Sequence, residues 1–449
     1  VLPFENLSDD ADQEHFADGL TEEILNVLAT VDNLRLVSRT SSFSYKDRST
    51  TIPEVAQQLG VQHILEGSVR RSGDRIRITA QLIDADNDAH LWSQTYDRTL
   101  SVENIFEVQE EVSEAVAQVL HASLRTTDER TLRVTPPRSI GAFDDYLAGM
   151  EYVRRLELGQ QDGRDELEFE RAVAVFESSI NADPNWAPSH AGLGRIHHFW
   201  IHLDRDRQFQ LSLTHITEAI RLDENYGPAW ASLGYLEMLS DNYDESLAAY
   251  NRARDLGAGN NWGRAILFRQ FAQYDQSVEE YRLARQWDPL SRPVRGQMLG
   301  ALYCAGQNDE FLEATLELIE DVPDNLDLKG FLAYARVKNG EVEEGLVLAN
   351  EVARAEGSDA SVLDVLALAG EEERVMRQLD SDRVLDFWGP QAAAAAIIGH
   401  TDTALDILES AEQRMRTSRE DIRCSPEIRQ LEDEPRFQAL LQRLDLSER

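Results

Sequence analysis

Histidines are the residues of this 449-residue chain whose spacing comes nearest to a metal site. His198 and His202 are four positions apart, so on a helix they would face the same way and offer two imidazoles to one metal ion. A third ligand would have to come from Asp204 or from a neighbouring segment. Two alternatives stay open for the cluster His190–His202: partly exposed helix residues without a ligand, or a pH sensor.

Other chemical motifs are missing from the sequence. It contains no Gly-x-Ser-x-Gly elbow, no phosphate loop with lysine, no paired Cys-x2-Cys and no His-Glu-x2-His. We therefore predict no cofactor and no enzymatic activity, although a triad assembled from dispersed residues remains an alternative. Cys304 and Cys424 do not make a disulfide framework and leave the cellular compartment open.

Arginines gather around one predicted turn. Arg70, Arg71, Arg75 and Arg77 flank Ser72-Gly73-Asp74, where they could bind an anionic ligand or an acidic partner strand. The other interpretation is a solvated sheet face paired with acidic neighbours. Arg39 lies in Ser38-Arg39-Thr40-Ser41-Ser42, whose hydroxyls could bond a ligand or hold a turn of the fold.

Charge argues against nucleic acid as a partner. Lysine and arginine total 44 and the acidic residues total 82, so the formal charge is 44 − 82 = −38, which repels a phosphate backbone. Lys46, Lys329 and Lys338 are the only lysines, and the other 44 − 3 = 41 basic residues are arginines. An acidic, lysine-poor surface suits a salt-tolerant bacterium, while a GC-rich genome would explain the lysine deficit alone.

The first 125 residues predict an α+β domain. Residues 75–84 alternate apolar and polar side chains, which indicates a hairpin strand with one dry face. We expect a small, mostly antiparallel sheet with helices on one side. The expected strands are Val1–Phe4, 34–38, 63–71, 75–84 and 89–96, and the expected helices are 12–30, 53–60 and 102–124.

A helical hairpin is predicted over residues 226–257. Its two runs have apolar residues at helical spacing, and Ser240-Asp241-Asn242 separates them. A lone hairpin of this size cannot bury both apolar faces, so similar units must stack beside it. The residues at helical spacing are Trp230, Leu233 and Gly234, then Leu247, Tyr250 and Ala253.

Similar units recur along the chain, and they resemble tetratricopeptide repeats. Leu193-Gly194, Leu299-Gly300-Tyr303 and Leu332-Ala333 open comparable units. We assign 126–140 as a linker, 141–357 as an all-α tetratricopeptide-type solenoid, and 358–449 as a helical extension with a C-terminal cap. The groove of such a solenoid would take a protein or peptide, with Trp230, Asn261 and Trp262 as contact residues.

Phrases in residues 1–125 resemble the TolB amino-terminal-like (FlgO-like) domain. They are VLPFENLS, FADGLTEEI, RTSSF, LGVQHILEGSVRRSGDRIRITAQLID and HLWSQTYDR. The resemblance implies a sensory or interaction portion of a bacterial signalling or transcription-regulatory protein, as in CadC-like membrane-tethered regulators and cyclase- or kinase-linked sensors. Its ligand would bind in the solenoid groove or at the domain interface. A cell-envelope assembly adaptor without an output domain is the alternative, and an enzyme is the third.

The start of the chain predicts a missing upstream part. Val1-Leu2-Pro3-Phe4 is predicted to lie within a strand that begins earlier, so we expect an output domain or membrane anchor before it. Resemblance to membrane-tethered regulators favours the periplasm over the cytoplasm, whereas the acidic charge does not distinguish them. A homodimer is left open.

Overall fold

The computed structural model describes residues 1–8, 13–29, 31–32, 34–46, 48, 50–120, 123–124, 136–157, 166–200, 202, 204–258, 262–380, 388–412, 421–444 and 446. They belong to two compact units. The first unit comprises residues 1–263 and 284–291, and the second comprises residues 264–283 and 292–449.

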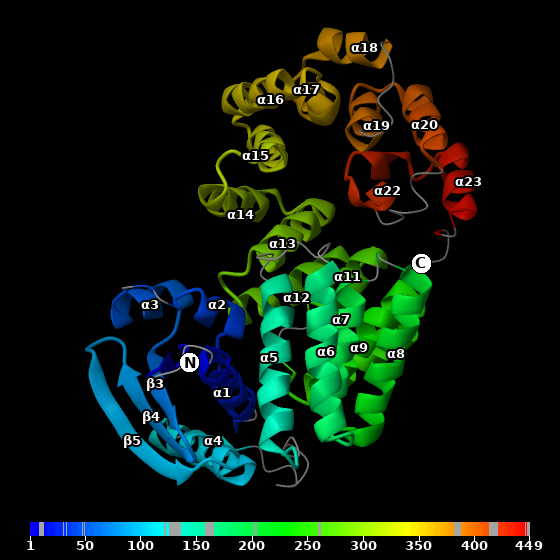
Figure 1. The fold of residues 1–449 in the computed structure, drawn as a ribbon. Coiled ribbons are helices and arrows are strands. Elements are labelled where there is room, and N and C mark those ends of the chain that lie inside the picture. Colours follow the sequence, from blue (N-terminus) through cyan, green and yellow to red (C-terminus); the bar gives the residue numbers. More distant parts are fainter. Residues whose placement is uncertain are drawn as a thin grey trace. The chain divides into compact units, whose positions relative to one another are not determined.

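A four-stranded sheet begins the first unit (Figure 1). β1 is parallel to β3, and the pairs β3–β4 and β4–β5 are antiparallel, which confirms a mostly antiparallel sheet. Alternation in β4 gives one dry face, because Ile76 and Ile78 are at most 1% exposed while Arg75 and Arg77 are exposed. The strand order is β1 (Glu5–Asn6), β3 (His63–Ser72), β4 (Arg75–Asp84) and β5 (Ala89–Thr99).

Helices cover the dry face of this sheet. They begin at polar residues suited to the free N–H groups of a first turn: Ser101 accepts a hydrogen bond from Asn104 N at the start of α4, and Thr51 and Glu54 form a capping box at α3. A second, two-stranded sheet joins β2 (Val31–Asp32) to β6 (Ser123–Leu124). The helices of this domain are α1 (Glu14–Leu28), α2 (Arg39–Phe43), α3 (Ile52–Leu59) and α4 (Val102–Val119).

Helical hairpins make up the rest of the first unit. In the hairpin predicted over 226–257, the helices are α9 (Gly227–Leu239) and α10 (Tyr243–Asp255). Gly234 lets them approach closely, because a Cβ there would lie 2.8 Å from Cδ1 of Tyr250. The preceding helices are α5 (Ile140–Glu157), α6 (Glu166–Ala182), α7 (Ala187–Phe199) and α8 (Arg205–Leu222).

The second unit continues the helical hairpins, so the prediction of an α+β domain followed by an all-α solenoid is confirmed (Figure 1). Helices α11 (Gly263–Gln270) and α12 (Tyr274–Trp287) have residues in both units. The others are α13 (Arg292–Ala305), α14 (Asn308–Asp321), α15 (Leu326–Lys338), α16 (Val342–Glu356), α17 (Leu363–Leu368), α18 (Glu372–Asp380), α19 (Trp388–Ile397), α20 (Thr401–Ser410), α22 (Asp421–Cys424) and α23 (Pro435–Arg443), with short 3₁₀ turns η2 (Ala360–Val362) and η4 (Ile428–Leu431).

The C-terminal residues predicted to form an apolar side are buried. Each of the six is at most 4% exposed, as a cap on the last helices requires. A disulfide joins Cys304 to Cys424, with the two Cα atoms 4.4 Å apart, and the sequence alone did not indicate it. The six residues are Ile428, Leu431, Phe437, Leu440, Leu441 and Leu444.

Three expected elements differ from the structure. The first strand is Glu5–Asn6 and not Val1–Phe4, although Leu2 N still donates to Leu65 O. Residues 34–38 form no strand, because their backbone has no neighbouring strand to pair with in the described part of the chain. Helix α4 ends at Val119, and residues 126–135 of the expected linker lie outside the described residues.

Among the described helices, none combines the length and the apolar character needed to cross a bilayer.

Candidate functional site

Helix α1 lies between the sheet and α5 (Figure 1). The Phe16 ring meets the Phe143 ring edge-on, at 6.3 Å between centroids. A Cβ on Gly19 would lie 2.3 Å from Cδ2 of Leu147, so glycine permits this close approach. One apolar core continues from Phe4 in the α+β domain to Trp200, directly after α7. The α+β domain and the first hairpins are therefore one packed body.

Buried polar groups interrupt that core beside α1. Burial raises the pKa of the Glu23 carboxyl to about 8, and the neighbouring Glu22 adds to the shift. Tyr146 of α5 and Tyr226 before α9 bond to each other and lie close enough to Glu23 to feel its charge. Burial also raises the pKa of both phenols. The raised pKa values mean that all three groups keep their protons at neutral pH.

Lys46, which follows α2, forms ion pairs with two acidic residues of α1. Lys46 Nζ lies 2.6 Å from Asp18 Oδ1 and 2.8 Å from Glu14 Oε1. Burial raises the pKa of Asp18 even though Lys46 opposes the shift. Because Asp18 is only 3% exposed, loss of Lys46 would leave a buried carboxyl without its cation.

Helix α2 anchors residues far along the chain. Ser41 Oγ donates to Asp288 Oδ1 at 2.6 Å and accepts from Leu290 N at 2.9 Å, while Ser38 N donates to Trp287 O at 2.5 Å. Ser38 also caps α2 by accepting from Ser41 N. The Ser38 and Ser41 hydroxyls therefore bond within the fold, while the buried Ser42 hydroxyl has no hydrogen-bond partner among the described residues.

Arg39 of the same helix faces α1. Its guanidinium forms an ion pair of 2.5 Å with Glu22 and lies 4.8 Å from the centre of the Phe43 ring. Its Nε is buried with no hydrogen-bond partner. Arg39 therefore sits beside the Glu23 cluster rather than at the surface.

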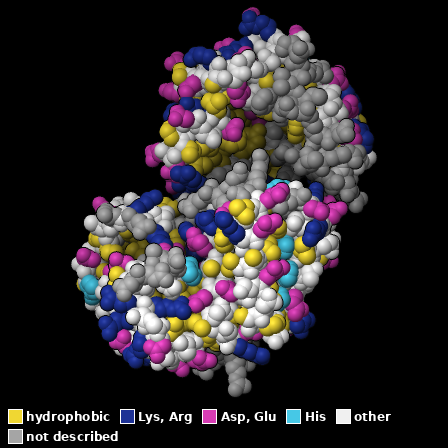
Figure 2. Space-filling model, viewed as in Figure 1, with side chains coloured by type: hydrophobic (Ala, Val, Ile, Leu, Met, Phe, Trp, Pro, Cys, Tyr) yellow, Lys and Arg dark blue, Asp and Glu magenta, His cyan; other side chains and the backbone are white. Residues whose placement is uncertain are grey.

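The four arginines around the β3–β4 turn separate. Arg70 Nε donates to Leu7 O, Arg71 pairs with Asp144 of α5 at 3.1 Å, and Arg77 forms two bonds with Asp97 of β5. Arg75 is exposed at the start of β4. Acidic neighbours thus take up two of the four, and Figure 2 shows basic and acidic side chains interspersed on the drawn face.

The structure describes two of the three repeat residues predicted to contact a partner. Trp230 Nε1 donates to the backbone of Glu224, just before its own helix. Trp262 is partly exposed in the turn that precedes α11. Asn261 lies outside the described residues.

The two histidines predicted as metal ligands, His198 and His202, lie in different surroundings. The His198 ring packs edge-on against Tyr235 at 4.3 Å, and burial lowers its pKa to about 4. His202 lies in an exposed turn. Within the described residues, no three histidine, cysteine or acidic side chains are arranged to hold a metal ion, so the predicted pair lacks a third ligand there.

Three other histidines come together. His190 Nδ1 lies 3.4 Å from His215 Nδ1, and His197 stacks on His215 and contacts Gln208 Oε1 at 2.7 Å. Burial lowers the pKa of His215 to about 4, and His197 and His190 add to the shift. His215 was missed because it lies on α8, in the second helix of the hairpin.

Comparison with protein families and known proteins gives few matches. No family model matches the chain. Over 196 residues the chain is 38% identical to "Putative adenylate cyclase 3" of Rhizobium meliloti (strain 1021). This match covers 44% of the chain and about a third of the relative's length, 32%.

Among the solved structures that the chain resembles are two tetratricopeptide repeat proteins. YrrB, described as a TPR protein with an unusual peptide-binding site, is 15% identical with a TM-score of 0.35, covering 44% of this chain and 97% of its own. A tetratricopeptide repeat protein from Parabacteroides merdae ATCC 43184 is 13% identical with a TM-score of 0.34, covering 61% and 93%. At these TM-scores neither structure carries an argument about what this chain binds.

Proposed function

We propose that this chain is a non-enzymatic sensory and protein-interaction portion of a bacterial signalling or transcription-regulatory protein. The observation that carries the proposal is the shared core of the α+β domain and the first hairpins. A partner that displaces a hairpin of this unit must also disturb α1 and the sheet. Binding and the state of the α+β domain are then coupled through one packed body.

Buried polar contacts restrict this coupling to a few discrete arrangements of the helices. Glu23, Ser41 and Asp288 are buried, and each depends on a specific partner or on a bound proton. A small shift of α2 would leave Asp288 without the hydroxyl that bonds it, which costs about 1–3 kcal/mol. Such an interface favours two discrete arrangements over gradual deformation.

Sequence resemblance supports an output domain elsewhere in the protein. The TolB-like phrases of residues 1–125 resemble domains that follow winged-helix or catalytic domains. The relative from Rhizobium meliloti is named as an adenylate cyclase, which makes cyclic nucleotide synthesis the first output to test. The partner would be a protein, a peptide or a small ligand that binds the solenoid or its junction with the α+β domain.

The disulfide supports an oxidising compartment. Disulfides persist in secreted and periplasmic proteins and are rare in the bacterial cytoplasm. The Cys304–Cys424 bond therefore favours the periplasmic side, in agreement with the resemblance to membrane-tethered regulators.

The test uses the native gene in its source cells. Asp288→Ala should open the α2 contact, and Glu224→Ala, at an exposed position, is the control. We expect Asp288→Ala to change cyclic nucleotide or target-transcript levels at least threefold, with the control unchanged. Equal protein levels, checked with an antibody to this portion, would exclude degradation of the variant protein as the cause.

The same antibody distinguishes the alternatives. Cleavage by protease added outside spheroplasts would place this portion on the periplasmic side. An unchanged output in the Asp288→Ala strain, together with a native protein no larger than this chain, would support the envelope adaptor and reject the sensor.

A further inference from the structure

A short segment near the C-terminus contacts one side of the second unit's hairpins. We call residues 421–431 the anchor segment. Its α22 contacts α13 and its η4 contacts α19, and each of those helices is the first of a hairpin, as are α15 and α17. Ile422 and Ile428 of the segment are fully buried. The anchor segment therefore lies on the side where stacked hairpins bind extended peptides.

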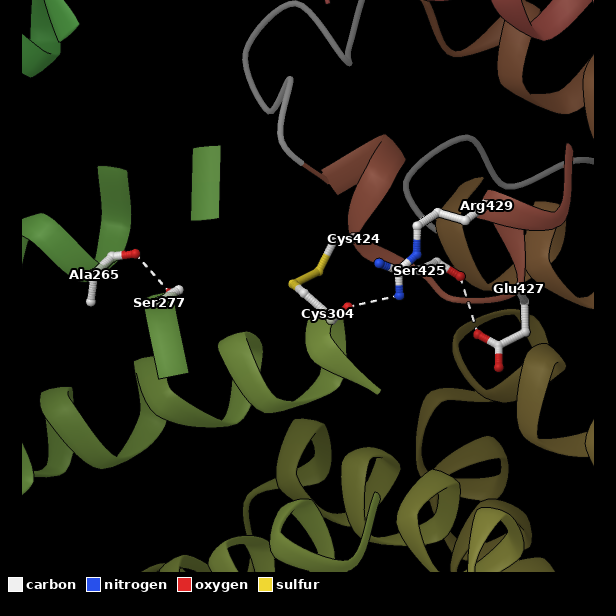
Figure 3. The surroundings of a disulfide bond; sticks show 7 residues. All are labelled: Ala265, Ser277, Cys304, Cys424, Ser425, Glu427 and Arg429. Atoms are coloured by element: carbon white, nitrogen blue, oxygen red, sulfur yellow. Dashed lines mark hydrogen bonds between the residues drawn. A yellow bond between two sulfur atoms is a disulfide. The ribbon is translucent and has the colours of Figure 1, made fainter. Parts of the chain in front are cut away.

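Two tethers hold the segment at the end of α13 (Figure 3). Cys424 is bonded to Cys304, and Arg429 donates to Cys304 O at 2.7 Å. The Arg429 guanidinium also lies 5.0 Å from the centre of the Tyr274 ring. The Arg429 side chain thus joins the anchor segment to the backbone of α13 and to an aromatic ring of α12.

Glu427 is the central polar contact of the segment. It is 2% exposed, and its Oε1 accepts from Tyr334 OH at 2.8 Å and from Lys338 Nζ at 3.1 Å. Its Oε2 accepts from Ser425 Oγ at 3.2 Å. The two donors outside the segment, Tyr334 and Lys338, both belong to α15. This helix therefore provides a preformed binding site for a carboxylate.

The composition of the site is unusual for this chain. Lys338 is one of three lysines in a chain of net charge −38. Burial raises the pKa of the Tyr334 phenol, so it remains a donor at every physiological pH. Without an acceptor, the Lys338 ammonium and the buried Tyr334 hydroxyl would lose their hydrogen-bond partner.

We propose that Tyr334 and Lys338 form a binding site for an acidic peptide, and that the anchor segment is its intramolecular occupant. The partner would present a glutamate to α15 and an aliphatic residue directly after it, as Glu427 and Ile428 do. The disulfide keeps the occupant at high effective concentration, so a free peptide competes only when the segment is loosened. The inference rests on the proposed interaction role, for which it names the partner class.

The first test measures binding of a synthetic peptide to the full chain. The peptide carries residues 421–432 with Ser in place of Cys424 and a fluorescent label, and the matched control has Gln in place of Glu427. The opened chain carries Cys304→Ser, Cys424→Ser and Glu427→Ala. We expect micromolar binding to the opened chain, at least tenfold weaker binding of the control peptide, and none to the wild type.

Lys338→Met in the opened chain should weaken binding at least tenfold. If a folded opened chain, checked by circular dichroism, binds both peptides equally or neither, the segment is only a structural cap and the proposal is overturned. That outcome leaves the Asp288 test of the proposed function intact, because Asp288 belongs to the first unit.

A second test keeps the disulfide. Glu427→Ala removes a carboxylate whose place acetate can fill. We expect acetate to raise the melting temperature of this variant saturably by at least 3 °C, while acetamide, and acetate on Glu427→Ala with Lys338→Met, do not. Equal effects of acetate and acetamide would overturn the carboxylate site.

Discussion

Ser41 Oγ donates a hydrogen bond of 2.6 Å to Asp288 Oδ1, across 247 positions of sequence, and both residues are buried. Burial raises the pKa of Asp288, although its bonds with Ser38 and Ser41 oppose the shift. The carboxylate is thus held by the hydroxyls of α2 in a place that water does not reach.

Asp288→Ala should lower the free energy of unfolding of the first unit by about 1.5–3 kcal/mol, because it removes a buried hydrogen bond to a charged group. Asp288→Asn, which can still accept from Ser41, should lower it by less than half as much. Urea titrations followed by tryptophan fluorescence measure both. Glu224→Ala is the surface control, expected within about 0.5 kcal/mol of wild type, and a similar loss in all three variants would contradict the assignment.

Two glycines of the α15–α16 hairpin should respond in opposite directions. A Cβ on Gly345 would lie 2.4 Å from Cγ2 of Val337 and 2.9 Å from Ala333 O, whereas one on Gly330 meets no atom within 4 Å. Gly345→Ala should destabilise the second unit by about 1–3 kcal/mol through overpacking. Gly330→Ala should stabilise it by about 0.5–1 kcal/mol through helix propensity. Chemical denaturation tests the pair, and the same sign for both would refute the close packing.

Acid should weaken the first unit through His198, whose side chain is half-buried. The folded-state pKa of His198 is about 4, below the ordinary value of 6.5, so the unfolded chain binds more protons between these pH values. The stability is full above pH 6.5 and is lost as the pH falls toward 4. His198→Phe should reduce the slope by up to about 1.4 kcal/mol per pH unit. Unfolding free energies at pH 7.5, 6 and 5 measure it, and an unchanged slope would count against burial of this ring.

Glu23 should act in the opposite direction. Its folded-state pKa is about 8, above the ordinary 4.5, so the folded chain binds more protons between these values and loses stability as the pH rises through 8. Glu23→Gln keeps the shape without the charge and should stabilise the first unit by about 2–4 kcal/mol at pH 9. At pH 5 the two proteins should differ little. A variant less stable than wild type at pH 9 would show that the Glu23 charge is compensated.

Local patterns predicted most of the helices and the hairpin sheet. Ile76 and Ile78 alternate with Arg75 and Arg77, and this alternation places them on opposite faces whatever the rest of the chain does. The residues Ser240, Asp241 and Asn242 likewise separate two helices, because their side chains favour turns over helix interiors. These features depend on neighbours within a few positions.

Contacts between distant residues could not be predicted in this way. Residues 34–38 alternate like a strand, but Ser38 N pairs with Trp287 O and not with a strand. Glu427 lies in a region whose apolar side was recognised, yet its partners on α15 are about 90 positions away. The sequence marked Lys338 only by rarity, and nothing in it paired Cys304 with Cys424.

The Cys304–Cys424 bond also changes how the second unit responds to force and to proteases. It closes a covalent ring across 120 positions of sequence, so roughly 400 Å of extended chain cannot be drawn out by pulling on residues outside the ring. A single protease cut within that ring leaves the two fragments joined until the bond is reduced. Force-extension curves recorded with and without reductant would show the extra extension that reduction of the bond releases. Gels run with and without reductant would show whether the cleaved fragments remain joined.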